Sequence, residues 1–292
     1  MEFLRPGSWA DALAAKAAYP DAIPIAGGTD VMVELNFDVK RPAVLLDLTR
    51  IGELTEWAPV GSSLRIGAGV SYSRLIAELG GPLPGLAMAA RTVGSPQIRN
   101  RGTVGGNLGA ASPAGDAHPP LLANDAVVEA HSVRGVRHIR IADFYLGVKR
   151  SALAADELIA AYWLRPASGP QQFAKIGTRN AMVISVTAFA LSLHPERQEV
   201  GTGFGSAAPT PRRAVGAEQF LNAELTASGR WESRADLTPA VITRFGQLVA
   251  AAAAPIDDVR GTAEYRRHAL AVLARRTLTW TWKDYATERK AA

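Results

Sequence analysis

The 292-residue sequence predicts an α+β protein built from two domains. Its length is about twice that of a typical domain. The first half alternates short apolar runs with helical patterns, whereas the second half has strands first and helices afterwards. Pro and Gly at residues 166–170 indicate a linker between the halves. We therefore expect one domain at residues 1–170 and a second at residues 171–292.

The first domain is expected to mix strands and helices along the chain. Apolar runs that end in turn residues predict strands, and capping residues followed by Gly or Pro stops predict helices. The predicted strands are residues 23–26, 44–48, 64–68, 126–130, 136–141 and 158–164, and the predicted helices are residues 71–79, 83–93 and 121–124. Residues 101–120 are rich in Gly, Ser and Pro, so we expect a long loop there.

The second domain is expected to be a sheet covered by helices. Residues 185–193 and 200–204 are apolar runs of strand length. The helical patterns that follow them are residues 213–221, 239–254 and 262–284. Strands followed by helices are typical of layered α+β domains.

Composition and charge exclude several functional classes. The sequence has no Cys, which excludes disulfides, a Cys nucleophile, a thiolate zinc site and an iron–sulfur cluster held by this chain. The net charge is +5, but the basic residues are spread out, which favours solvated faces or subunit contacts over a nucleic-acid groove. No signal peptide is evident, and the longest apolar run, residues 248–254, is too short to span a bilayer. A soluble cytoplasmic protein is therefore expected.

The common catalytic and nucleotide-binding motifs are absent. The sequence contains no G-x-G-x-x-G, no P-loop, no G-x-S-x-G elbow and no H-E-x-x-H. No convergent acid–base set is apparent in the C-terminal half. We therefore predict no catalytic residue and no metal ligand in this chain.

A first glycine loop, residues 25–30, follows a predicted strand and precedes a helical segment. Gly27 and Gly28 lack Cβ atoms, so the backbone can turn sharply and approach a ligand closely. Successive N–H groups in such a loop form an anion nest suited to a diphosphate. Thr29 adds a hydroxyl donor, and Asp30 is placed to cap the following helix. The alternative is an ordinary tight turn between a strand and a helix.

A second glycine loop extends over residues 102–116. Gly106 again frees backbone N–H groups, and Asn107 offers both a donor and an acceptor. Ser112 can donate a hydrogen bond, and the Asp116 carboxylate can accept two from sugar-like hydroxyls. Long glycine-rich loops in compact domains are usually functional, although an irregular structural loop is the alternative. Two such loops together favour a dinucleotide ligand.

Five motifs in order carry a resemblance to a known family. They are AGGTD at residues 26–30, TVGGN at 103–107, SPAGD at 112–116, K-x-x-x-R at 175–179 and DVRGTAEYRR at 258–267. Together they resemble the FAD-binding medium subunit of the molybdenum hydroxylase family, which includes xanthine and carbon monoxide dehydrogenases. AGGTD and the run YLGVKRSAL at 145–153 favour the xanthine-dehydrogenase-like branch. Val183 stands where the family commonly has Asp, which is expected to alter a domain contact or the acceptor side.

The resemblance implies a fold, a cofactor and partners. The fold would be a vanillyl-alcohol-oxidase-type FAD-binding domain with lobes at about residues 1–55 and 56–170. A C-terminal α+β domain like that of the CO dehydrogenase flavoprotein would follow. The chain would pass electrons from a small subunit with two [2Fe–2S] clusters, through FAD, to an acceptor such as NAD, oxygen or a quinone. A large molybdopterin subunit and a dimer of heterotrimers are also implied.

The resemblance also implies the residues that contact FAD. Residues 26–31 would line the diphosphate, and the second loop would hold the phosphates and the ribityl chain. Asp116 would bond the polar chain of FAD, and Lys175 would lie near the polar edge of the flavin. Val93 would form an apolar wall, and Ile159 would pack near the adenine or the flavin. The full predicted set is Ala26, Gly27, Gly28, Thr29, Asp30, Val31, Val93, Thr103, Gly106, Asn107, Ser112, Asp116, Ile159 and Lys175.

Two other functions remain open at this point. The first is a stand-alone FAD oxidoreductase of the same fold, with its substrate bound under the C-terminal domain. It predicts turnover of an organic substrate by the chain alone. The second is a nucleic-acid-binding module that uses the basic patches, which predicts steeply salt-dependent binding. Aromatic residues make up only 7% of the chain, which disfavours the second alternative.

Overall fold

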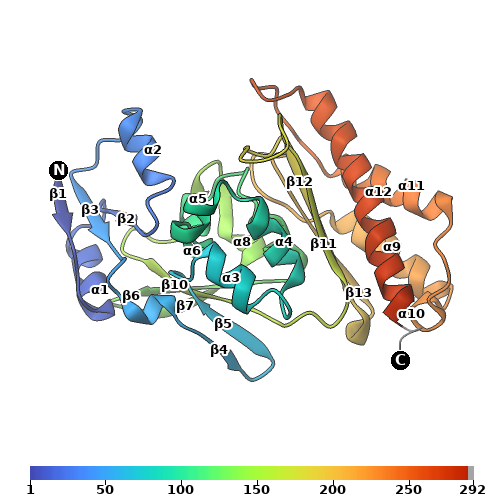
Figure 1. Ribbon diagram of the computed structural model, residues 1–292, viewed down its shortest axis with the longest axis horizontal. Coiled ribbons are helices and arrows are strands. Elements are labelled where there is room, and N and C mark those ends of the chain that lie inside the picture. The colour runs from blue at the N-terminus through green and yellow to red at the C-terminus, as the bar shows by residue number, and fades with distance from the viewer. Residues whose placement is uncertain (289–292) are drawn as a thin grey trace. The chain divides into compact units, whose positions relative to one another are not determined.

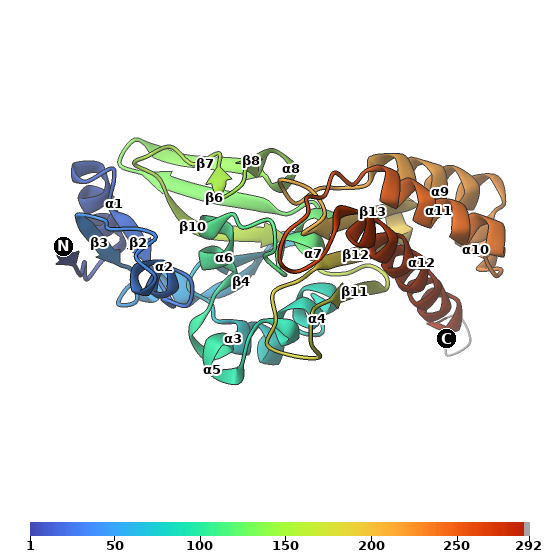
Figure 2. The same ribbon diagram turned by 90° about the horizontal axis from the view of Figure 1, so that it is seen from above.

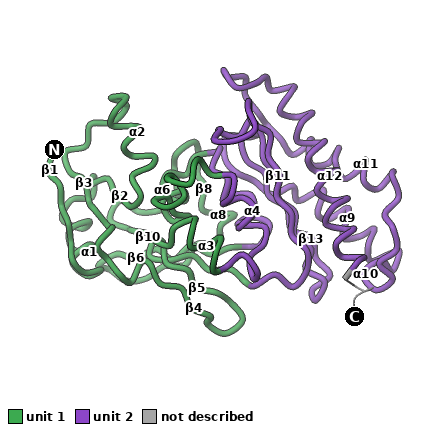
Figure 3. Tube along the Cα trace, in the orientation of Figure 1, with its two compact units in different colours: residues 1–78, 93–112, 126–165 green, residues 79–92, 113–125, 166–292 purple. Residues whose placement is uncertain are grey.

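The computed structural model describes residues 1–288, and its chain divides into two compact units. Unit 1 contains residues 1–78, 93–112 and 126–165, and unit 2 contains residues 79–92, 113–125 and 166–292 (Figure 3). The chain therefore leaves unit 1 twice before residue 166. Two short segments of the N-terminal half, residues 79–92 and 113–125, belong to unit 2.

Unit 1 begins with a small parallel sheet in the order β1–β3–β2 (Figure 1). Its strands are β1 (Glu2–Leu4), β2 (Ile23–Ile25) and β3 (Val44–Asp47), joined by helices α1 (Trp9–Ala18) and α2 (Val31–Asn36). The central strand, β3, is buried along its whole length, and its first three residues form a continuous apolar run rather than an alternating one. Helix α1 is capped at its N-terminus by Ser8, whose side chain accepts a hydrogen bond from the Asp11 N–H.

A larger antiparallel sheet in the order β4–β5–β10–β6–β7 forms the rest of the framework of unit 1 (Figure 2). Its strands are β4 (Trp57–Val60), β5 (Ser63–Gly67), β6 (Val127–Ser132), β7 (Gly135–Arg140) and β10 (Leu158–Leu164). Ile66, Val128 and Tyr162 are fully buried. The smaller elements of this unit are η1 (Gly52–Thr55), α3 (Tyr72–Glu78), α5 (Pro96–Arg101), α6 (Val104–Ala110), α8 (Ile141–Phe144), β8 (Tyr145–Gly147) and β9 (Arg150–Ser151).

Unit 2 is a three-layer structure around an antiparallel sheet of β11 (Gln171–Ile176), β12 (Thr187–His194) and β13 (Glu199–Gly205). One face of β12, with Phe189 and Leu191, packs against the C-terminal helices. These are α9 (Val215–Ala227), α10 (Arg230–Ser233), α11 (Pro239–Ala251) and α12 (Ala263–Glu288), with η2 (Pro195–Arg197) between β12 and β13. The opposite face, with Ala188 and Ala190, packs against α4 (Pro84–Thr92) and α7 (His118–Ala123). The period of two along β12 thus separates two apolar layers.

Two glycines of β13 let the backbone of α7 lie directly on the sheet. A Cβ atom built on Gly201 would lie 2.0 Å from the Ala123 carbonyl oxygen, and one on Gly203 would lie 2.1 Å from that of Pro119. Any larger residue at either position would push the helix off the strand.

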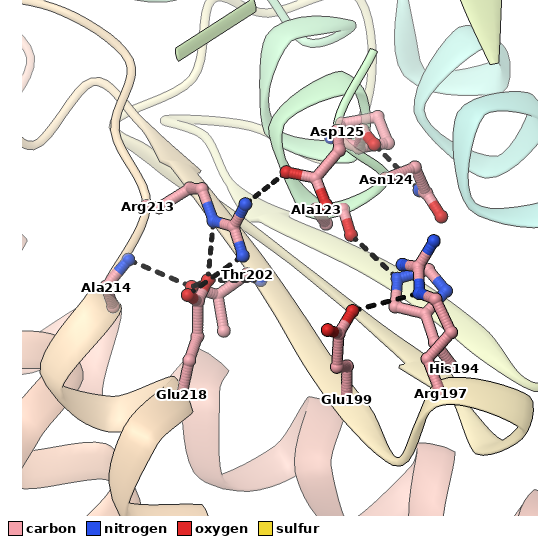
Figure 4. Close-up of polar contacts among 11 residues, drawn as sticks. Ala123, Asn124, Asp125, His194, Arg197, Glu199, Thr202, Arg213, Ala214 and Glu218 are labelled. Atoms are coloured by element: carbon pink, nitrogen blue, oxygen red, sulfur yellow. Dashed lines mark hydrogen bonds and ion pairs between the residues drawn. The ribbon is translucent and has the colours of Figure 1, made fainter. Parts of the chain in front are cut away.

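Polar contacts close the edge of this α7–β13 packing (Figure 4). The Arg213 guanidinium donates to Asp125, which follows α7, and to Glu218 of α9. Glu218 also accepts hydrogen bonds from the Thr202 N–H at 2.8 Å and hydroxyl at 2.7 Å. His194 lies 3.2 Å through Nε2 from the carbonyl oxygen of Ala123. Residues 113–125 are therefore fastened to unit 2 by both backbone packing and charge.

Most of the predicted strands and helices are present, with boundaries shifted by a few residues. The long loop expected at residues 101–120 was wrong in part, because α6 and the start of α7 lie within it. Helix α6 forms there because the Thr103 hydroxyl caps it, accepting from the Gly106 N–H at 2.8 Å. Helix α1 and strands β4 and β11 were not predicted. Among the described residues, no helix combines the length and apolar character needed to cross a membrane.

Candidate functional site

The two glycine loops meet within unit 1. A Cβ atom built on Gly27 would lie 2.0 Å from the Arg101 carbonyl oxygen, so backbone lies directly on backbone at this point. The next residue along, Gly102, lies beside Thr29, because its built Cβ would be 3.4 Å from the Thr29 hydroxyl oxygen. Only glycine at position 27 permits this approach. The structure thus brings together two loops that are about 75 residues apart in the sequence.

The first loop presents its backbone N–H groups without using them inside the protein. Gly28 has a φ of 75°, a conformation that favours glycine. In residues 1–288, the N–H groups of Gly27, Gly28 and Thr29 donate to no protein acceptor. Asp30 lies at the N-terminal end of α2, but its side chain makes no capping bond, so the predicted cap is absent. The loop therefore has free donors for an anion.

The second loop rests on the large sheet of unit 1. A Cβ atom on Gly105 would lie 2.4 Å from the Ala68 carbonyl oxygen, so this glycine seats α6 against the end of β5. Gly106 is exposed, and Asn107 points its side-chain oxygen into the protein. Within the described part of the chain, that buried oxygen has no hydrogen-bond partner. A buried acceptor left unpaired suggests a ligand that donates to it.

Val93 and Ile159 also belong to unit 1. The Val93 carbonyl accepts from Arg99 at 3.2 Å, which ties the turn after α4 to helix α5. Ile159 lies on β10 just before a register shift. The carbonyl of the next residue, Ala160, accepts from the Ala68 N–H at 2.9 Å, directly beneath Gly105. Strand β10 is therefore part of the support of the second loop.

Asp116 and Lys175 form a separate, buried cluster in unit 2. The Lys175 ammonium donates to Asp116 Oδ2 at 2.5 Å. Asp116 also accepts from the Ser185 hydroxyl at 2.5 Å and from the Thr92 hydroxyl at 3.1 Å. Only 10% of the Lys175 side chain and 8% of the Asp116 side chain are exposed, so this ion pair is nearly removed from water. Four segments of chain, including α4 and β11, supply its members.

Burial dominates the electrostatics of this cluster. Desolvation raises the pKa of Asp116 above its ordinary value, although Lys175, Ser185 and Thr92 all act in the opposite direction. A buried carboxylate depends on its donors, because each one that is lost leaves charge without compensation. The cluster is therefore sensitive to the loss of any single partner.

The predicted site residues fall into two groups in the structure. Unit 1 holds the residues of both glycine loops through Ser112, together with Val93 and Ile159, and unit 2 holds Asp116 and Lys175. Sequence reasoning missed Thr92 and Ser185. Neither lies in a glycine loop, and their connection to Asp116 depends on tertiary packing alone.

The arrangement suits binding of a phosphate-bearing cofactor better than acid–base chemistry. Free N–H groups, closely approaching glycines and a buried unpaired amide oxygen fit a dinucleotide such as FAD. The described residues include no group of three or more His, Cys, Asp or Glu side chains arranged to hold a metal ion. The buried carboxylate of Asp116 is already engaged by three donors.

Comparison with known proteins agrees with this reading. Residues 1–163 match the FAD-binding domain found in molybdopterin dehydrogenases, and residues 172–281 match the CO dehydrogenase flavoprotein C-terminal domain. The chain is 32% identical to a putative xanthine dehydrogenase FAD-binding subunit of Escherichia coli strain K12, over 94% of each chain. It is 31% identical to the nicotine 6-hydroxylase medium subunit of Paenarthrobacter nicotinovorans, over 95% of this chain and 96% of that one.

Solved structures show the same fold. A chain of carbon monoxide dehydrogenase from Hydrogenophaga pseudoflava superposes with a TM-score of 0.88 at 25% identity, over 98% of both chains. A chain of quinoline 2-oxidoreductase from Pseudomonas putida 86 gives a TM-score of 0.88 at 22% identity, over 98% of both chains. The predicted α+β fold, an FAD-binding domain followed by a CO dehydrogenase flavoprotein C-terminal domain, is thus confirmed. The chain belongs to the FAD-binding subunits of the molybdenum hydroxylase family, the flavoprotein components of molybdopterin-dependent dehydrogenases.

Proposed function

We propose that this chain carries electrons from an iron–sulfur subunit, through FAD, to an external acceptor. The observation that carries the proposal is the meeting of the two glycine loops in unit 1, with Gly27 against the Arg101 carbonyl and unused N–H groups beside it. FAD supplies the redox chemistry when bound, while the protein binds and orients it. The residues described here therefore act as binding groups.

The glycine loops provide the proposed direct contacts. The N–H groups of Gly27, Gly28 and Thr29 would donate to the diphosphate, helped by the close approach that glycine allows. The buried oxygen of Asn107 would accept from a hydroxyl of the cofactor. The remaining proposed site residues are Ala26, Asp30, Val31, Val93, Thr103, Gly106, Ser112, Asp116, Ile159 and Lys175.

The proposed partners follow from the same family relation. They are a small iron–sulfur subunit and a large molybdopterin subunit, assembled as a dimer of heterotrimers in the cytoplasm, with NAD, oxygen or a quinone as acceptor. The motifs AGGTD and YLGVKRSAL support a xanthine-dehydrogenase-like enzyme. Identity to a xanthine enzyme subunit is 32% and to a nicotine enzyme subunit 31%, so the proposed xanthine preference rests on the two motifs.

Gly106→Asp tests the cofactor site. A Cβ atom at Gly106 would meet only the Thr103 hydroxyl, at 3.2 Å, and an acidic residue in the first turn of α6 favours the helix dipole. The variant should therefore fold, while its carboxylate repels the diphosphate. We expect FAD affinity, measured by flavin fluorescence titration, to fall at least about tenfold, a loss of about 1.4 kcal/mol.

The matched control is Gly109→Asp on the same helix, where a Cβ atom would meet nothing within 4 Å. It should bind FAD like the unaltered chain. Equal affinities in the two variants would contradict the proposed site. Reduction of the bound flavin by an organic substrate, with no partner subunit present, would instead indicate a stand-alone oxidoreductase.

A further inference from the structure

The β11–β12 loop, residues 177–186, is anchored at its end by buried polar groups of unit 2. Lys175 precedes the loop in the sequence, and its ammonium group donates to the carbonyl oxygen of Val183 at 3.1 Å. Ser185 lies at the far end of the loop and donates to Asp116 Oδ1 at 2.5 Å. Asp116 and Lys175 bind each other, so the two anchors form one cluster.

The hydrogen-bonding capacity of Lys175 is used up within this cluster. An ammonium group has three N–H donors. Those of Lys175 have three acceptors, which are Asp116 Oδ2 at 2.5 Å, the Thr92 carbonyl oxygen at 3.0 Å and the Val183 carbonyl oxygen at 3.1 Å. A further acceptor on a cofactor would have to displace one of these three. The geometry therefore favours a supporting role for Lys175 over a direct hydrogen bond.

The loop itself has a defined shape. Arg179 donates to the carbonyl oxygens of Ala181 and Met182, and Met182 has a φ of 50°. The Val183 side chain packs over Gly177, where a built Cβ atom would lie 2.2 Å from it. The apolar side chains of Met182 and Ile184 are 55% and 54% exposed. Three carbonyl oxygens of the loop thus accept side-chain hydrogen bonds from Arg179 or Lys175, while the apolar side chains of Met182 and Ile184 are turned outward.

We propose that Ser185, assisted by Thr92, is a positioning residue of the FAD site. By donating to the buried Asp116 carboxylate, it holds the Asp116–Lys175 pair in place, and the pair fixes the β11–β12 loop. The contribution of Thr92 is smaller, because its hydroxyl also lies 2.7 Å from the Ala89 carbonyl oxygen and has one hydrogen to give. This inference rests on the proposed function, in which Lys175 and Asp116 belong to the FAD site.

Hydrogen–deuterium exchange of the flavin-free chain tests the anchoring step. Ser185→Ala leaves a buried carboxylate oxygen without its donor, so exchange of the Val186 N–H, which closes the loop by donating to the Ile176 carbonyl oxygen at 2.8 Å, should rise about tenfold. Ser192→Ala is the matched control, since Ser192 is also buried and lies on β12, outside the cluster. Ser185→Thr keeps the hydroxyl and should restore protection. Unchanged loop exchange in Ser185→Ala, or an equal rise in Ser192→Ala, would overturn the proposal.

FAD titration of the same variants tests the positioning step. Ser185→Ala should bind FAD about tenfold more weakly than the unaltered chain, whereas Ser192→Ala and Ser185→Thr should bind it normally. Raised loop exchange with unchanged FAD affinity in Ser185→Ala would overturn the positioning role. If Ser185→Ala does not fold, Thr92→Val removes the second hydroxyl donor while keeping its shape, and a smaller change in the same direction is expected.

The two possible failures are distinguishable. An unaltered chain that is folded but binds no FAD would remove the proposed function and, with it, the positioning role. The exchange comparison needs no flavin, so it would still decide whether the cluster anchors the loop.

Discussion

The glycine loops of unit 1 and the charged cluster of unit 2 hold polar groups in place in two different ways. In unit 1 the contacts are made by the backbone, because Gly27 and Gly105 lie directly against carbonyl groups. In unit 2 the contacts are made by side chains, because the Asp116 carboxylate accepts hydrogen bonds from Lys175, Ser185 and Thr92. The glycine loops therefore depend on the absence of Cβ atoms at the contact, whereas the charged cluster depends on the presence of every hydrogen-bond donor.

The largest expected effect is the loss of Lys175. Lys175→Met leaves the Asp116 carboxylate buried without its countercharge, which should cost about 4 kcal/mol of unfolding free energy. Urea denaturation at pH 7 measures this. The comparison in unit 1 is Lys149→Met, because Lys149 also pairs with a buried carboxylate, Glu34, but is 44% exposed. That change should cost less than about 1 kcal/mol. Equal losses in the two variants would contradict the contrast between the pairs.

The next effect is a dependence on pH that differs in sign between the units. In unit 1, burial would raise the pKa of Glu129, but hydrogen bonds from Arg65 and Trp163 outweigh it and lower the pKa to about 2. The stability that Glu129 contributes is therefore present above its unfolded pKa of about 4.3 and is lost as pH falls toward 2. In unit 2, the raised pKa of Asp116 contributes stability that is present at low pH and is lost as pH rises through that pKa.

Acid unfolding of variants separates these contributions. Between pH 4.3 and pH 2.5, Glu129→Gln should lose about 2 kcal/mol less stability than the unaltered chain. Asp116→Asn should lose more stability than the unaltered chain over the acid range, because it no longer takes up a proton in the folded state. Identical acid profiles for the two variants would show that the opposite shifts are absent.

A stability effect of similar size concerns the contact between the glycine loops. Gly27→Ala places a Cβ atom against the Arg101 carbonyl oxygen, so the two loops must separate, at a cost of about 2 kcal/mol and a large loss of FAD affinity. Gly7→Ala, where a Cβ atom would meet nothing within 4 Å, should change neither quantity. Thermal unfolding and flavin titration check both variants. Normal FAD binding by Gly27→Ala would mean that contact between the loops is not needed.

The sequence identified the glycines that bring the two loops together far more readily than the hydroxyls of the side-chain cluster. The glycine pairs of the two loops are visible in the sequence as short local motifs, at Gly27–Gly28 and Gly105–Gly106. The backbone conformations that they permit depend on only a few consecutive residues. Ser185 carries no such signal, because its role arises only when α4, residues 113–117 and the β11–β12 loop pack together. The roles of all the site residues, and the domain boundaries at residues 55 and 170, remain predictions.

The strands were predicted from their apolar patterns, whereas one helix was missed because of its glycine content. β3 and β12 were predicted because buried strands are apolar throughout or alternate. Helix α6 was missed because three of its seven residues are Gly, which suggested a loop. The hydroxyl cap at Thr103 and the close packing of Gly105 against the Ala68 backbone outweigh the low helix propensity of glycine.

The placement of α4 and α7 in unit 2 has a consequence for synthesis of the chain. Both helices precede residue 125, yet the sheet face that buries them is made by residues 171–205. During synthesis from the N-terminus, their apolar sides therefore stay uncovered until roughly 80 more residues have emerged after α7. A chaperone that binds nascent apolar segments should be engaged most over this interval, and a truncation at residue 170 should leave both helices without their partner sheet.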